Sequence, residues 1–123
     1  MKILVINGHP DKESYCQAIF QTIVETIDSN RHELKVINLN EENFDPVLRY
    51  GYRKRMEEDP FILRSQEWIQ WADHLIFVYP IWWSSMPSLM KGWIDRVFTP
   101  GIAYSANDQG SFIWNYLRGK QFK

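Results

Sequence analysis

The sequence predicts a three-layer α/β fold in which helices cover both faces of a doubly wound parallel sheet. One observation behind this prediction is that residues 3–6 and 75–79 are continuously apolar, which is typical of parallel strands buried on both faces. The other is that such runs alternate with segments whose apolar residues recur at helical spacing, and that polar loops join them.

Length and composition indicate an ordinary globular chain. It has 123 residues, and we expect a single domain over residues 1–123. The net charge of −1, from 14 basic and 15 acidic side chains, argues against nucleic acid as a partner. The apolar run at residues 3–6 is too short for a signal peptide or a membrane span, so we expect no membrane insertion and a cytoplasmic location. Cys16 is the only cysteine, which excludes an intrachain disulfide and a cysteine-based zinc site, and no metal ligand is predicted.

The first elements predict a right-handed βαβ unit. A strand is expected at residues 2–7, where Ile-Leu-Val-Ile is stopped by Asn-Gly. Ser14 is the expected N-cap of the next helix, because its hydroxyl can accept a hydrogen bond from a backbone N–H of the first turn. A second strand is expected at residues 33–39, and this strand-helix-strand order favours the right-handed crossover. The apolar positions of the helix lie on one face: Cys16, Ile19, Phe20, Ile23, Val24 and Ile27.

A long excursion is expected at residues 40–59, which show no periodicity and contain several turn residues. Its mixed charges predict a solvated surface with local ion pairs rather than a phosphate contact by one arginine. Asp59 and Pro60 then predict an N-cap and a proline at the first position of a helix that runs to about Ala72. The charged residues of the excursion include Arg49, Arg53, Lys54, Arg55, Glu57, Glu58 and Asp59.

The third strand is expected at residues 75–79, followed by a polar turn. Apolar residues recur at helical spacing over residues 86–97, and Ser84 or Ser85 is the expected N-cap of this helix. Beyond it the pattern is weaker, and Gly119 is expected to mark a turn before another strand.

Two polar loops follow the first and third strands, at residues 8–15 and 80–85. Because ligands of doubly wound sheets bind beyond the carboxyl ends of the strands, both loops are candidate parts of one site. The first offers backbone N–H groups, a helix N-terminus and the Ser14 hydroxyl, which suit a phosphate. The second offers Trp82 and Trp83, whose indole rings suit a planar heterocycle. Together they predict a nucleotide-like cofactor.

The same residues also allow structural interpretations. The first loop lacks the dinucleotide glycine fingerprint and the Walker lysine pattern, so an ordinary strand-to-helix loop is equally compatible with it. His9 could donate to a ligand or serve as a structural hydrogen-bonding residue. Cys16 lies where a lowered thiol pKa is possible, although a buried small hydrophobe is the favoured interpretation. Trp82 and Trp83 are equally candidates for the core or for a subunit interface.

Three motifs stand out: HPDKESYCQA at residues 9–18, NLNEENFDPVL at residues 38–48 and WADHLIFVYPIWWSSMPSLMKGWIDRVFTPGIAYS at residues 71–105. They closely resemble the NAD(P)H:quinone oxidoreductase family of flavodoxin-like flavoproteins, and the resemblance covers nearly the whole chain. The third motif is the most specific, with its aromatic-Pro-x-x-Trp step, its Met-Pro step and its Lys-Gly-Trp helix that ends in Asp-Arg-Val-Phe. The resemblance implies a five-stranded parallel sheet in the order 2-1-3-4-5 and a homodimer.

The resemblance also implies a cofactor and a reaction, in which FAD or FMN passes two electrons from NAD(P)H to a quinone. Tyr104 resembles the aromatic residue that borders the nicotinamide and quinone pocket from the partner subunit. No side chain is required as a nucleophile, so no catalytic residue is assigned. By matching position, the residues that would hold the flavin phosphate region are His9, Ser14, Tyr15 and Cys16. Those that would line the isoalloxazine ring are Pro80, Ile81, Trp82, Trp83 and Ser84.

The chain departs from the family at Lys123, where the fourth strand of the family would begin. We therefore expect strands 4 and 5 to be largely absent and the third strand to present an unpaired apolar edge. The chain is then either a fragment of a longer protein or a truncated homologue, and two further hypotheses for its function stay open. One is a non-catalytic regulatory or binding subunit, similar to the ancillary subunits of potassium-efflux systems, and the other is an inactive truncated homologue.

Overall fold

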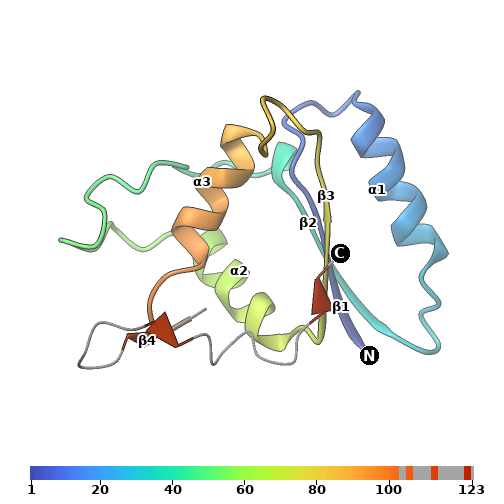
Figure 1. Ribbon diagram of the computed structural model, residues 1–123. Coiled ribbons are helices and arrows are strands. Elements are labelled where there is room, and N and C mark those ends of the chain that lie inside the picture. The colour runs from blue at the N-terminus through green and yellow to red at the C-terminus, as the bar shows by residue number, and fades with distance from the viewer. Residues whose placement is uncertain (103–104, 107–111, 114–120, 123) are drawn as a thin grey trace.

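The computed structural model of the chain describes residues 1–102, 105–106, 112–113 and 121–122 (Figure 1). Strands and helices alternate through most of this length, as predicted. In order, the elements are β1 (Lys2–Asn7), α1 (Tyr15–Thr26), β2 (Glu33–Asn38), η1 (Leu39–Glu41), α2 (Pro60–Trp71), β3 (His74–Val78), α3 (Ser88–Val97), β4 (Ser105–Ala106), β5 (Phe112–Ile113) and β6 (Gln121–Phe122).

The main sheet has four strands in the order β2-β1-β3-β6, and each neighbouring pair is parallel. β4 and β5 form a separate antiparallel pair. Helix α1 covers one face of the main sheet, and α2 and α3 cover the other (Figure 1). The predicted three-layer fold is confirmed, and its first three strands have the order 2-1-3 that the resemblance implied.

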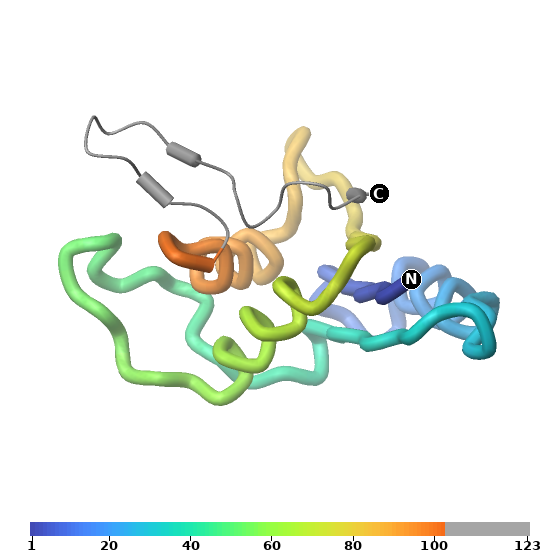
Figure 2. Tube along the Cα trace, turned by 90° about the horizontal axis from the view of Figure 1, so that it is seen from below, coloured from blue at the N-terminus to red at the C-terminus, as the bar shows by residue number. Residues whose placement is uncertain are grey.

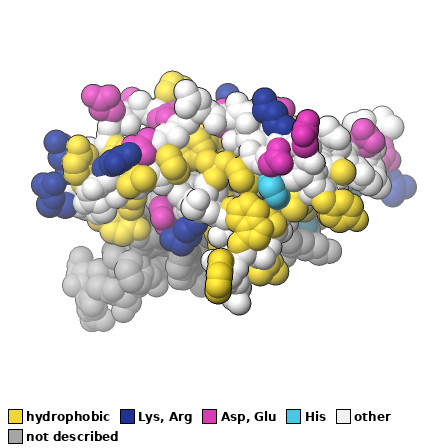
Figure 3. Space-filling model, turned by 90° about the horizontal axis from the view of Figure 1, so that it is seen from above, with side chains coloured by type: hydrophobic (Ala, Val, Ile, Leu, Met, Phe, Trp, Pro, Cys, Tyr) yellow, Lys and Arg dark blue, Asp and Glu magenta, His cyan; other side chains and the backbone are white. Residues whose placement is uncertain are grey.

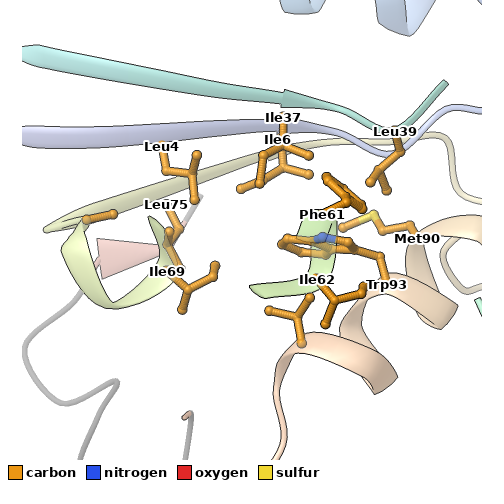
Figure 4. Close-up of a cluster of buried hydrophobic side chains, with 12 residues drawn as sticks. Leu4, Ile6, Ile37, Leu39, Phe61, Ile62, Ile69, Leu75, Met90 and Trp93 are labelled. Atoms are coloured by element: carbon orange, nitrogen blue, oxygen red, sulfur yellow. The ribbon is translucent and has the colours of Figure 1, made fainter. Parts of the chain in front are cut away.

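The two faces of the sheet bury different side chains, because successive residues of a strand point to opposite faces. On β1, Leu4 and Ile6 pack with the α2 and α3 layer, whereas Ile3 and Val5 pack with α1. All four are buried, which explains why this strand is apolar without interruption. The larger cluster, between the sheet and α2 with α3 (Figure 4), consists of Leu4, Ile6, Ile37, Leu39, Phe61, Ile62, Ile69, Ala72, Leu75, Met90, Trp93 and Val97.

The predicted N-caps of α1 and α2 are confirmed. Ser14 Oγ accepts a hydrogen bond from the backbone N–H of Gln17 at 3.1 Å. Asp59 Oδ1 accepts one from the backbone N–H of Phe61 at 2.9 Å, and Pro60 is the first residue of α2. Each cap satisfies an N–H group of the first turn that has no acceptor within its own helix.

Three predicted boundaries differ from the structure. β3 covers His74–Val78, one residue earlier than the predicted range 75–79. Helix α3 begins at Ser88 with Pro87 at the N-cap position, and neither Ser84 nor Ser85 caps it. Those two serines belong to a tight turn instead. β2 ends at Asn38, because the next residue begins the short helix η1.

The edge of β3 is partly covered, so the expectation of an unpaired third strand is wrong for its first residues. Gln121 and Phe122 of β6 pair in parallel with His74 and Leu75. This pairing engages backbone groups that an open edge would leave exposed. β6 is the further strand that the sequence predicted after Gly119.

Residues 42–59 form the expected excursion without helix or strand, on the side of α2 and α3 that faces away from the sheet (Figure 2). Arg49 Nε lies 2.8 Å from Asp45 Oδ2 in an exposed ion pair, and the hydrogen bond from Arg49 lowers the pKa of Asp45. The ammonium of Lys54 lies 5.0 Å from the ring centroid of Tyr50. The predicted solvated surface with local ion pairs is confirmed.

One hydrogen bond joins α2 to α3 inside the larger core cluster. The Nε1–H of Trp93 donates to Ser65 Oγ at 3.0 Å, and both residues are 0% exposed. The Trp93 ring also meets the rings of Phe77 and Phe98 edge-on, with centroids 6.5 Å and 5.9 Å away. Ser65 thus allows a large indole to fill the core without leaving its N–H unpaired.

We predict that Ser65→Ala destabilises the protein by about 1–3 kcal/mol, because the indole N–H of Trp93 would stay buried without an acceptor. Urea unfolding followed by tryptophan fluorescence measures the change. Glu67→Ala, at an exposed position of the same helix, is the matched control and should alter stability by less than about 0.5 kcal/mol. A loss in Ser65→Ala no larger than in the control would contradict the role given to this hydrogen bond.

Candidate functional site

The loops after β1 and β3 meet at the carboxyl end of the sheet. The backbone N–H of Gly8 donates to the carbonyl of Val78 at 2.8 Å, which ties the start of the first loop to β3. The rings of His9 and Trp82 meet edge-on with centroids 5.3 Å apart. A Cβ at Gly8 would lie 2.5 Å from Sδ of Met90, so any larger residue here would displace the Met90 side chain of α3. The structure thus brings together the two halves of the predicted site.

Large apolar side chains gather on the surface at this end of the molecule (Figure 3). Tyr15, Ile81 and Trp83 are 82%, 74% and 100% exposed, and Trp82 is half-exposed. Contiguous apolar side chains in solvent are typical of a surface that binds a ligand or a partner.

The first loop presents hydrogen-bond donors at the start of α1. Ser14 caps the helix with its oxygen as the acceptor, which leaves its hydroxyl proton available to a ligand. Tyr15 and Cys16 lie in the first turn, where backbone N–H groups have no acceptor within the helix. Nδ1 of His9 accepts a hydrogen bond from the backbone N–H of Asp11 at 3.0 Å, so the proton of the neutral imidazole lies on Nε2. These donors together suit an anion.

The thiol of Cys16 is partly buried in α1. Burial raises the pKa of this thiol above its usual value, so the alternative of a lowered pKa is wrong. The interpretation as a buried small hydrophobe holds in part, because the residue keeps some exposure.

The second loop carries a tight turn at residues 82–85. The N–H of Trp82 donates to the Ser85 carbonyl at 2.9 Å, and the N–H of Ser85 donates to the Trp82 carbonyl at 3.1 Å. Between them, Trp83 and Ser84 have positive φ angles of 52° and 58°, as a type I′ turn requires. This left-handed conformation costs free energy in residues other than glycine, so the turn is strained. The turn holds the Trp83 side chain entirely in solvent.

This placement excludes one interpretation of the tryptophan pair. Because Trp82 is half-exposed and Trp83 is fully exposed, neither side chain belongs to the core. Pro80 is half-buried just after β3, Ile81 is exposed, and Ser84 lies within the turn. All five residues predicted to contact a ring therefore lie on one short loop that projects from the sheet.

Four amide side chains at the same edge were not identified from the sequence, and we call Asn7, Gln17, Asn38 and Asn40 the amide cluster. Gln17 Oε1 accepts hydrogen bonds from the Nδ2 groups of the three asparagines, at 3.0 Å, 3.0 Å and 2.9 Å in chain order. Asn7 Nδ2 also donates to Asn38 Oδ1 at 3.0 Å, and Asn40 Oδ1 is buried without a partner among the described residues. One sequence signal points to the cluster: β1 and β2 both end in Val-Ile-Asn, and their register places Asn7 opposite Asn38.

Tyr104, the predicted substrate-pocket residue, lies outside the described residues. Among the residues that the structure does describe, no group of three or more His, Cys, Asp or Glu is placed to hold a metal ion. In the same part of the chain, no helix combines the length and apolarity needed to cross a bilayer. The described site thus consists of donors for an anion beside an exposed aromatic surface.

Comparison with known proteins relates this site to a family. The model of a protein family described as having a flavodoxin-like fold matches residues 1–122 of the chain. NAD(P)H dehydrogenase (quinone) 1 of Cavia porcellus is 30% identical over 134 residues, which cover 90% of this chain and 49% of that protein. The chain spans between 49% and 62% of the length of the first curated relatives that it matches.

Solved structures show the same architecture. Smu.1420 from Streptococcus mutans UA159 superposes with a TM-score of 0.85 at 34% identity, covering 99% of this chain and 65% of that chain. The general stress protein 14 of Treponema denticola, solved in complex with FMN, superposes with a TM-score of 0.65 at 26% identity, covering 99% of this chain and 59% of that chain.

We predict that Ser84→Gly stabilises the protein by a few tenths to about 1 kcal/mol, because glycine adopts the left-handed conformation without the steric cost that serine bears. Thermal unfolding measures the shift. Ser29→Gly is the matched control, since Ser29 is exposed and has no positive φ. Glycine there should lower stability by increasing the entropy of the unfolded chain. Destabilisation of the same size in both variants would contradict strain at Ser84.

We also predict that Cys16 reacts slowly with iodoacetamide at pH 7, because only the thiolate reacts and burial raises its pKa. The pH midpoint of the reaction rate should lie above that of the same chain unfolded in urea, which serves as the reference. A midpoint at or below the reference would show that the helix N-terminus dominates after all.

Proposed function

Since the chain belongs to the flavodoxin-like fold family, we propose that it binds a flavin and takes part in the reduction of a quinone-type acceptor by NAD(P)H. The observation that carries this proposal is the meeting of the two loops at one edge of the sheet, where His9 and Trp82 are in ring contact. Donors for a phosphate and a surface for a planar ring thereby lie side by side, which is what a flavin nucleotide requires.

The phosphate half of the proposed site is the start of α1. His9 would donate through Nε2, Ser14 through its hydroxyl, and Tyr15 and Cys16 through their backbone N–H groups. The helix dipole favours negative charge at the same place. No step of this binding requires a thiolate at Cys16, in keeping with the raised pKa of its thiol.

The ring half of the proposed site is the loop of Pro80, Ile81, Trp82, Trp83 and Ser84. Its exposed apolar side chains offer a face against which an isoalloxazine ring could stack, and covering them would remove apolar surface from water. A bound flavin supplies the hydride-transfer chemistry. The task of these residues is to orient the ring and exclude water from one of its faces.

The similar proteins support the finer parts of the proposal. The relative from Cavia porcellus is named as a quinone-dependent NAD(P)H dehydrogenase, and the protein from Treponema denticola was solved with FMN. We therefore propose FMN or FAD as the cofactor and NAD(P)H with a quinone as the substrates. We further propose a cytoplasmic homodimer in which Tyr104 borders the substrate pocket of the partner subunit.

We predict that the purified protein binds FMN and that Trp83→Ala weakens this binding roughly tenfold, because a stacked aromatic ring contributes about 1–3 kcal/mol. Flavin fluorescence quenching measures the affinity, and thermal unfolding without flavin should be unchanged, since Trp83 is fully exposed. Tyr52→Ala, in the exposed excursion, is the control and should leave FMN affinity unchanged.

Two results would contradict the proposal. Wild-type protein that binds neither FMN nor FAD would favour the non-catalytic or inactive hypotheses over an oxidoreductase. Equal loss of affinity in Trp83→Ala and Tyr52→Ala would place the flavin elsewhere.

A further inference from the structure

The amide cluster connects four elements at the end of the sheet where the candidate site lies. Asn7 ends β1, Asn38 ends β2, Asn40 lies in η1, and Gln17 lies in the first turn of α1. All three asparagines donate to the same oxygen, Gln17 Oε1. Asn7 is 0% exposed and Asn38 is 8% exposed, so their amide groups depend on protein partners rather than on bulk water.

The same cluster holds the backbone of His9 from both sides. The His9 N–H donates to Asn7 Oδ1 at 3.1 Å, and the His9 carbonyl accepts from Asn40 Nδ2 at 3.5 Å. Asn7 can offer its oxygen to His9 only while its nitrogen faces Gln17, because the two atoms lie on opposite sides of one planar amide. Asn38 Oδ1 accepts from the same nitrogen at 3.0 Å, so Gln17 and Asn38 together set the orientation of the asparagine that holds His9.

The ring of His9 is fixed as well. Its Nδ1 accepts a hydrogen bond from the N–H of Asp11 at 3.0 Å. The His9 and Trp82 rings pack in a T-shaped arrangement with their centroids 5.3 Å apart. With backbone and ring both held, the Nε2–H of His9 has a defined direction. Gln17 is also linked to the helix cap, because its own N–H donates to Ser14 Oγ at 3.1 Å.

We propose that Gln17 is a positioning residue for phosphate binding, whose side-chain oxygen holds the amide cluster so that His9 and the first turn of α1 donate to one phosphate ester. This inference rests on the proposed function, in which the phosphate belongs to FMN or FAD. Glutamine suits the position because it is a neutral acceptor, which adds no negative charge beside an anion. Without its oxygen, three amide donors would lose their common acceptor, and Asn7 would be oriented only by Asn38, so the hold on His9 would weaken.

The test compares FMN and FAD with riboflavin, which has the same ring and no phosphate. In Gln17→Met, which keeps the length of the side chain but removes the acceptor, the Kd for the phosphate-bearing flavin should rise roughly tenfold or more. The Kd for riboflavin should stay unchanged. The nucleotide with the larger loss, FMN or FAD, identifies the phosphate that the site holds. Gln21→Met, at an exposed position of α1, is the matched control and should change none of the three affinities.

Other outcomes of these titrations overturn the inference. Equal losses for riboflavin and both nucleotides would show a general structural role for Gln17, and no loss for any flavin would show no role. If Gln17→Met does not fold, Asn40→Ala gives the same comparison, because it removes the contact to the His9 carbonyl and leaves Gln17 in place.

A second measurement needs no flavin. Amide hydrogen exchange should be faster at His9 in Gln17→Met than in the wild type, whereas Gln17→Glu, which retains an acceptor oxygen, should keep the wild-type protection. Unchanged protection in Gln17→Met would overturn the inference.

Failure of the proposed function can be separated from failure of this inference. If the wild type binds no flavin, inorganic phosphate becomes the probe, and the readout is the NMR shift of His9 Nε2. A phosphate-dependent shift that Gln17→Met abolishes would support the inference alone. No shift in the wild type would overturn it.

Discussion

The parallel register of β1 with both of its neighbours positions the loops of the candidate site and the two buried faces of the sheet. Asn7 lies opposite Asn38 of β2 and Val78 of β3, so the three strands end at the same level. Parallel strands cannot be joined by tight turns, and each connection runs from the carboxyl end of one strand back to the amino end of the next. The loops that follow β1 and β3 must therefore both leave from the carboxyl end of the sheet, which is where His9 contacts Trp82.

Burial of the central strand holds that register in place. β1 has side chains packed on both faces, and a shift by one residue would exchange Leu4 and Ile6 with Ile3 and Val5. The edge strand β2 is less constrained, since Val36 is 39% exposed. β1 is thus continuously apolar because it is a central strand, whereas β2 has a mixed pattern because it is an outer strand of the sheet.

Two features at the carboxyl end of the sheet cost free energy, although packing of the core requires neither of them. One is the left-handed backbone at Trp83 and Ser84, and the other is the burial of polar amides such as that of Asn7. The tight turn exposes an indole, and the amide cluster satisfies its buried donors by converging them on Gln17. Both features lie at the edge where a flavin would bind, and strain or buried polarity of this kind is typical of functional sites.

Features that depend on nearby residues could be predicted from the amino-acid sequence: the buried run of β1, the alternation of strands and helices, and the caps Ser14 and Asp59, whose partners lie two or three positions away. Packing of the folded chain was needed to show that Trp83 is exposed to solvent, that β6 covers the start of β3, and that Gln17 accepts from amides 10 to 23 positions away. The physical reason is the separation along the chain of the residues that interact. A cap or an apolar period is a local property of the chain, whereas exposure, strand pairing and a shared acceptor exist only once register and packing have brought distant residues together.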